Sequence, residues 1–152
     1  METYIDSNLS SNERIIQRAK VSYYSQIGKF ALAVFFIFAF IGNNKLIFLL
    51  ALSVLLLVSA FLNIFTTELA FTNKKVIAKT GFIRRDTVEL KLDRVEALMV
   101  NQSILGRIFN FGTITVSGTG GIKTPIPYIS NPIYFRNVFN EYIDNPSLLE
   151  NK

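Results

Sequence analysis

The sequence predicts a helical membrane hairpin followed by a small β-rich domain that one C-terminal helix closes. Residues 30–65 contain a single charged side chain, that of Lys45. Residues 66–127 alternate apolar and polar side chains in short stretches separated by Gly, Asn and Pro, which is the period of half-buried strands. Residues 131–145 return to helical spacing. The chain is therefore expected to have a membrane part and a β part.

The second half of the apolar stretch has the length and composition of a membrane-spanning helix. Residues 46–65 are apolar on every helical face, so a helix here offers no polar side to water. At about 1.5 Å per residue it spans about 30 Å, the thickness of a bilayer's hydrocarbon core. Ser53 and Ala60 share one face of this helix and are expected to pack closely against Ala39 or Gly42 of the preceding segment.

The first half of the stretch is shorter. Residues 30–42 make about 20 Å of helix, which is less than a crossing requires. Extended back to Val21, the segment reaches crossing length, and Lys29 can carry its charge to the headgroups along its stem. Tyr23 and Tyr24 then stand where interfacial aromatic residues are expected. Two alternatives remain, a re-entrant first segment and a hairpin buried in a soluble protein, although a domain this small could not enclose such a hairpin.

The charges beside the hairpin predict its orientation. The link between the two helices carries one basic residue, whereas the flanks carry seven: Arg14, Arg18, Lys20, Lys29, Lys74, Lys75 and Lys79. The positive-inside rule therefore places both termini in the cytoplasm. The protein is expected to be a multi-pass protein of the cytoplasmic membrane.

The β part has six stretches with the features of strands, and turn residues separate them. They are residues 66–73, 75–81, 87–92, 95–100, 112–118 and, as an edge strand because of its prolines, 122–127. Asn131 and Pro132 suit the start of a helix, and Asn145 with Pro146 suits its end. The inward face of this helix is predicted to consist of Phe135, Val138, Phe139 and Tyr142. Such strands can form a curled antiparallel sheet whose open end the helix covers.

The composition excludes several classes of chemistry. The chain has no Cys and no His, so disulfides, Cys or His metal sites and thiol or imidazole mechanisms are excluded. The net charge of +5 predicts anionic neighbours. Acidic lipid is preferred to nucleic acid, because the basic residues are scattered among acidic ones. Neither a cofactor nor a metal is expected. The glycines of residues 118–121 lack the spacing of a phosphate-binding loop, and the acidic residues of residues 86–96 suit exposed strand faces.

The order of these elements and several of their sequences resemble the membrane-flanked bacterial pleckstrin-homology-like (PH-like) domain family, in its short form with one transmembrane hairpin. The matching stretches are ELAFTNKKVI (68–77), QSILGRI (102–108), FGTI (111–114) and NPIYFRNVF (131–139). The resemblance implies a PH-like roll of six or seven antiparallel strands on the cytoplasmic side of the hairpin, and it implies no established reaction.

The expected organisation has four parts. They are a cytoplasmic tail and flank (1–20, of which 1–12 is expected to be mobile), the transmembrane hairpin (21–65), the PH-like domain (66–145) and a C-terminal tail (146–152).

Basic residues in the connections between strands are the first candidate site. Lys74 and Lys75 lie in the first strand turn, and Arg84 and Arg85 follow in the next connection. The resemblance makes this turn a candidate, because the first strand turn of eukaryotic PH domains often holds phosphoinositide-binding residues. The hypothesis is that these four residues contact anionic lipid headgroups close below the bilayer. The alternative is an ordinary solvated hairpin face.

The second candidate is the loop Leu105-Gly106-Arg107. Arg107 is a candidate partner contact. The alternative is a structural role, in which Gly106 permits a tight bend and Arg107 pairs with a carboxylate.

The predicted function is that of a membrane-anchored, non-enzymatic interaction or scaffolding protein, possible partners being other proteins or further copies of the chain. The edge strand at residues 122–127 is a candidate contact. The alternative is a sensor of anionic lipid headgroups. A membrane enzyme or a transporter accessory subunit is disfavoured, because neither apolar segment carries the acidic residue that marks ion pathways.

Overall fold

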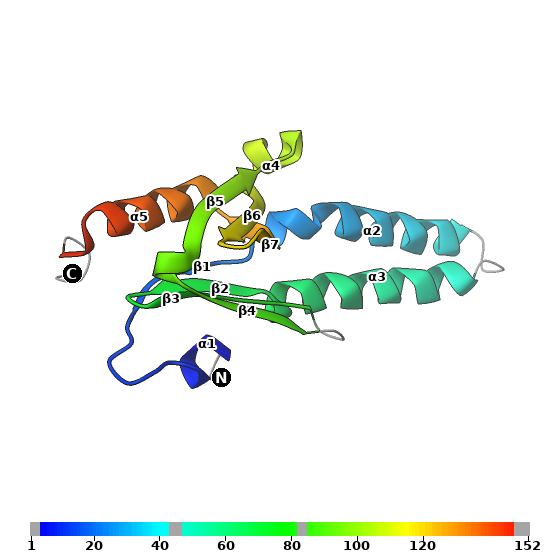
Figure 1. Ribbon diagram of the computed structural model, residues 1–152. Helices are drawn as coiled ribbons and strands as arrows, with labels where there is room; N and C mark the ends of the chain where they lie inside the picture. Colours follow the sequence, from blue (N-terminus) through cyan, green and yellow to red (C-terminus); the bar gives the residue numbers. More distant parts are fainter. Residues whose placement is uncertain (1–3, 43–46, 82–84, 148–152) are drawn as a thin grey trace.

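The computed structural model describes residues 4–42, 47–81 and 85–147 (Figure 1). Two long helices project as a hairpin from a body of two antiparallel sheets, and the last helix runs away from the hairpin along the other side of that body. This architecture confirms the predicted fold of a helical hairpin, a roll of antiparallel strands and a closing helix. The link between the helices, with Asn43, Asn44 and Lys45, lies outside the described residues.

The hairpin consists of α2 (Ile27–Gly42), which the short 3-10 helix η1 (Tyr23–Gln26) precedes, and α3 (Ile47–Thr66). The spans Tyr23–Gly42 and Ile47–Thr66 are each 20 residues long and apolar enough to cross a membrane. Only 11% and 17% of their most apolar windows is buried inside the structure. Because a core helix of a soluble protein is mostly buried, these helices do not act as the core of the described molecule.

Small residues are the most buried part of the contact between the two helices, which also includes the edge-to-face rings of Phe30 and Phe61. Ala33 of α2 and Ser53 and Ala60 of α3 are almost fully buried. The prediction that Ser53 and Ala60 lie on the packed face is therefore confirmed. Gly42, one of the partners expected for them, is exposed and has open space around it. The Ser53 hydroxyl donates a hydrogen bond to the Leu50 carbonyl (2.7 Å), so the packed face contains no unpaired hydroxyl at this position.

In the part of the chain that the structure describes, seven strands form the two sheets. The order of the first sheet is β1 (Ile15–Ala19), β2 (Glu68–Thr72), β3 (Lys75–Thr80) and β4 (Asp86–Lys91). The order of the second is β5 (Val95–Asn101), β6 (Phe111–Gly118) and β7 (Ile122–Ser130). The 3-10 helix η3 (Leu92–Arg94) connects the sheets, and the short helix α4 (Ile104–Ile108) connects β5 to β6.

Strand β1 comes from the segment before the hairpin, which corrects the assignment of residues 15–19 to a flank outside the sheets. Ala19 pairs with Leu69 of β2, and Val21 then forms a bridge with Ile129 of β7. All five residues of β1 are half-buried, so the strand lacks the alternation by which the others were predicted. The hairpin is thus the connection between two neighbouring strands, and residues 20–22 join the two sheets along one side.

The first residues also differ from the expected mobile tail. Residues Tyr4–Ser7 form helix α1, and Ile5 is buried against Ala70 of β2 and Ile77 of β3. The Arg18 guanidinium pairs with the Asp6 carboxylate. The N-terminal segment therefore covers the outer face of the first sheet.

The core of the roll centres on the aromatic ring of Phe71, which is fully buried. Helix α5 (Pro132–Asp144) places Phe135, Phe139 and Tyr142 around it, with ring centroids 5.6, 5.3 and 5.7 Å from that of Phe71. These are three of the four residues predicted for the buried face of the closing helix, and the fourth, Val138, is partly buried against the same cluster. Aromatic pairs at such distances add to the stabilisation from apolar burial, so α5 locks the two sheets together.

The roll has two ends of different character. Among the described residues, the hairpin end consists of residues 20–26, 66–68, 80–81, 85, 101–111 and 130–132, where the chain enters α2 and leaves α3. The far end consists of residues 73–75, 91–95 and 118–122. Strand β3 runs between them over about 17 Å.

Candidate functional site

The predicted basic site does not come together in the structure. Lys74 and Lys75 lie in the β2–β3 turn at the far end, whereas Arg85 precedes Asp86, which pairs with Thr80 at the hairpin end. Arg84 lies outside the described residues. Because β1 precedes the hairpin, the β2–β3 turn is also the second connection of the roll and not its first. Lys74 and Lys75 thus stand about one strand length away from Arg85.

Lys75 is held by acidic residues of its own chain. Its ammonium lies 2.8 Å from a carboxylate oxygen of Glu89 and 3.6 Å from one of Glu13, and it donates a hydrogen bond to the Asn8 carbonyl (3.1 Å). Only 15% of its side chain is exposed. The hydrogen bond to Glu89, opposed by burial and helped by the charge of Glu13, raises the pKa of Lys75 above its ordinary value. Lys75 therefore fastens the N-terminal segment to the first sheet.

The Glu13 carboxylate is the centre of this network, and its side chain has no exposed surface. One oxygen accepts a hydrogen bond from the Thr72 hydroxyl (2.7 Å) and the other accepts one from the Ser10 backbone N–H (2.8 Å). Burial raises the pKa of Glu13, but these hydrogen bonds and the charge of Lys75 outweigh burial, so the net pKa is lowered. Sequence reasoning missed Glu13 because Thr72 lies 59 residues further along the chain.

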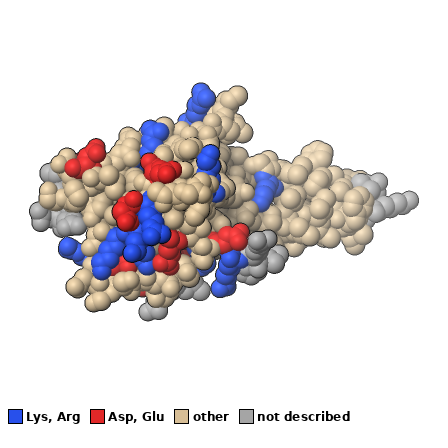
Figure 2. Space-filling view, viewed as in Figure 1, with Lys and Arg blue, Asp and Glu red and all other residues tan. Residues whose placement is uncertain are grey.

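A cleft of about 530 Å³ opens beside this network at the far end. Its lining residues are Ser10, Glu13, Lys74, Lys75, Glu89 and Lys91. The ammonium of Lys74 donates to the Ser11 carbonyl (2.8 Å). Figure 2 shows basic and acidic groups interleaved over β3 and β4 in this region. Because both signs of charge line the cleft, it suits a mixed-charge protein surface better than a simple anion.

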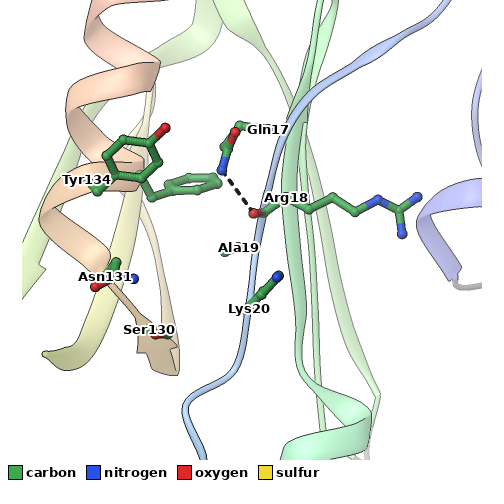
Figure 3. Close-up of a pocket in the computed structure, with 8 residues that line it drawn as sticks. Gln17, Arg18, Ala19, Lys20, Ser130, Asn131 and Tyr134 are labelled. Atoms are coloured by element: carbon green, nitrogen blue, oxygen red, sulfur yellow. Dashed lines mark hydrogen bonds between the residues drawn. The ribbon is translucent and has the colours of Figure 1, made fainter. Parts of the chain in front are cut away.

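A second, smaller cleft of about 200 Å³ lies between β1 and the start of α5 (Figure 3). Gln17 and Tyr134 flank it, and the Gln17 side chain donates a hydrogen bond to the Arg18 carbonyl (3.4 Å). The Arg18 side chain points away from the cleft towards α1. Residues 17–20 form one wall of this cleft and residues 130–135 the other, so it could not be predicted without β1.

Arg107 lies on α4 at the hairpin end and is exposed. No ion pair among the described residues includes Arg107, so the expected pairing with a carboxylate is not observed there. Together with Arg136 of α5 it lines a shallow depression of about 330 Å³, whose other lining residues are Val100, Asn101, Gln102 and Ile133. Two guanidinium groups beside two amide side chains suit a phosphate or carboxylate.

Gly106 has a structural role, although a different one from the expected bend. A Cβ atom at this position would lie 2.5 Å from the Phe111 carbonyl oxygen, so only glycine permits this close approach. The Ser103 hydroxyl accepts a hydrogen bond from the Gly106 N–H (3.1 Å) and caps α4. The loop is therefore held firmly on the end of the sheet.

Within the described residues, no group of three or more Asp, Glu, His or Cys side chains is placed to hold a metal ion. The clefts offer amine, guanidinium, amide and carboxylate groups, which can bind a partner by hydrogen bonds and ion pairs.

Comparison with known proteins identifies the family. The family described as Bacterial PH domain matches residues 27–142, which include both long helices, β2 to β7 and most of α5. No curated protein and no solved structure matched the chain. The match covers well over half of the chain and agrees with the two sheets and the closing helix observed, and the protein therefore belongs to the bacterial PH domain family.

Proposed function

We propose that the protein is a membrane-anchored, non-enzymatic interaction or scaffolding protein that presents the far end of its PH-like domain to protein partners. Family membership indicates a lipid or protein interaction module. The observation that carries the proposal is the direct join between hairpin and roll. Helix α3 ends at Thr66 and β2 begins at Glu68, while β1 leads into η1 through only residues 20–22.

These joins fix the orientation of the domain. Both legs of the hairpin continue into neighbouring strands, so a hairpin in the bilayer holds the hairpin end at the membrane and turns the far end away from it. Helices α2 and α3 contain one charged residue, Lys29, in the first turn of α2, and Figure 2 shows a surface almost without charged groups along the hairpin. The positive flanks support a cytoplasmic location for the domain, at the inner face of the cytoplasmic membrane.

Protein partners are favoured over headgroup sensing by Lys74 and Lys75. The Lys75 ammonium is already used within the chain, and the β2–β3 turn lies at the far end. Residues 122–127 of β7 are a candidate surface for self-association. Among the described residues, this part of β7 pairs only with β6, so it is an edge to which another strand could add.

Cross-linking and mass spectrometry of the full chain in mild detergent test this proposal. We expect discrete partners or oligomers, and we expect them to be weakened by the far-end double variant Lys74→Glu and Lys91→Glu. The matched control is Arg85→Glu at the hairpin end, which should leave protein partners in place. Recovery of monomer with co-purified anionic lipid as its sole companion would favour the lipid-sensor alternative.

A further inference from the structure

We propose that α4 is a second membrane contact, which inserts Ile104, Leu105 and Ile108 into the interfacial layer of the bilayer beside the hairpin. The proposal rests on the proposed function in that it requires the hairpin to lie in a membrane. It goes beyond that function by assigning a lipid-facing role to a loop of the roll itself.

The first observation is the exposure of the apolar side chains of α4. Ile104 is 78% exposed, Leu105 54% and Ile108 68%, whereas Gly106, which has no side chain, is the buried residue of this helix. Three neighbouring apolar side chains that face outward are costly in water and indicate a surface made for an apolar environment.

The second observation is that this outward projection is built into the loop. The Gln102 side chain donates hydrogen bonds to the carbonyls of Gly106 (3.1 Å) and Phe111 (3.0 Å). With the cap from Ser103 and the close approach at Gly106, these bonds fix both ends of α4. The apolar side chains therefore cannot turn inward without breaking several partly buried hydrogen bonds.

The third observation identifies the occupant as lipid. The ring of Phe109, which follows α4, stacks on that of Tyr24 in η1, with centroids 5.4 Å apart and planes at 13°. Helix η1 opens the first apolar span, so α4 stands at the level where that span would enter the bilayer (Figure 1). Tyr23 and Tyr24 are exposed there, as interfacial tyrosines are. The stack thus holds the exposed apolar side chains of α4 beside the start of the hairpin.

The charges around α4 agree with this placement. Residues 101–111 contain no acidic side chain, and their one basic residue is Arg107. The depression that Arg107 shares with Arg136 can accept a headgroup phosphate while the isoleucines enter the layer below. An acidic protein partner could bind the same cations, but it would leave the exposed apolar side chains of α4 uncovered.

The test uses the absence of cysteine from the chain. Single variants Ile104→Cys and Ile108→Cys of the full chain carry an environment-sensitive fluorophore in vesicles of phosphatidylcholine and phosphatidylglycerol. Nitroxide-labelled lipid serves as the membrane quencher and iodide as the aqueous one. Ile122→Cys, at a 50% exposed isoleucine of the far end, is the matched control. Val54→Cys, on the exposed surface of α3, reports whether the hairpin is inserted.

We expect labels at positions 104 and 108 to show blue-shifted emission and to lose intensity to nitroxide lipid, while the label at position 122 loses intensity to iodide only. If position 54 is quenched by nitroxide lipid but 104 and 108 respond to iodide, α4 lies in water and the inference is overturned. Protection of 104 and 108 from both quenchers would reveal a protein contact and also overturns it. Failure of nitroxide lipid to quench position 54 would overturn the membrane anchoring itself, and this inference with it.

Discussion

The two ends of the roll are built from the same strands but have opposite surfaces. At the hairpin end, α4 and η1 expose isoleucine, leucine and tyrosine side chains around a few cations. At the far end, Lys75, Glu89 and Glu13 satisfy one another's charges. A lysine pair close to a membrane segment is therefore insufficient to indicate a lipid site. In the proposed orientation, the direction in which each strand runs decides whether its turn faces the bilayer or water.

The two ends of the roll also differ in the contacts that stabilise them. The far end depends on polar contacts from the N-terminal segment, whereas the hairpin end depends on backbone joins to α2 and α3. The aromatic cluster around Phe71 is a third kind of contact, which packs α5 against the roll.

The largest expected effect comes from the substitution Phe71→Ala, which would weaken both ends together. It removes the ring that contacts Phe135, Phe139 and Tyr142. We expect the free energy of unfolding to fall by about 3–5 kcal/mol, as for other buried aromatic residues. Thermal unfolding in mild detergent measures the loss, with the exposed Ile122→Ala as control. A loss no greater than that of the control would show that α5 does not lock the sheets.

The next largest effect is expected at the far end alone. Glu13→Leu leaves the Thr72 hydroxyl and the Ser10 N–H without their acceptor and Lys75 without one of its carboxylates. We expect a destabilisation of about 2 kcal/mol, together with faster proteolysis of the N-terminal segment. Limited proteolysis with mass spectrometry locates the cleavage. Equal cleavage of this variant and of the exposed control Glu96→Gln would mean that Glu13 does not fasten the segment.

The same carboxylate predicts a pH dependence. Because the pKa of Glu13 is lowered on folding, the unfolded chain binds more protons in acid, and stability rises with pH in this range. The contribution of Glu13 is fully present above its ordinary pKa of 4.5 and is lost as the pH falls through the lowered value. The difference in melting temperature between the native chain and Glu13→Gln should therefore shrink below pH 4.5. A difference that stays constant with pH would contradict this assignment.

The smallest effect concerns lipid. In the proposed orientation Arg85 lies near the bilayer and Lys74 does not, so Arg85→Glu should reduce retention of phosphatidylglycerol by about fivefold, or about 1 kcal/mol. Lys74→Glu should have little effect. Quantification of lipid that stays bound to the detergent-purified chain gives both values. The reverse order would return the headgroup site to the β2–β3 turn.

Sequence patterns predicted the parts of the fold that depend on local periodicity. Residues 46–65 could only be an apolar helix, and the spacing of Phe135, Phe139 and Tyr142 defined the buried face of α5. Strand β1 was missed because its side chains are evenly half-buried and because its partner β2 follows the hairpin. The headgroup site was proposed from four basic residues whose separation depends on how β3 is oriented.

By itself, the sequence determined a hairpin apolar enough to cross a membrane, a set of short strands and a closing amphipathic helix, because hydrophobic periodicity and length are local properties. Only the tertiary structure decided that the hairpin joins two adjacent strands, that Lys75 serves its own chain and that α4 stands beside the start of α2. These features depend on contacts between residues far apart in the chain, and local patterns do not record such contacts. The apolar stretch is thus an insertion within the roll, and in the proposed orientation it gives the roll one end for lipid and one for partners in water.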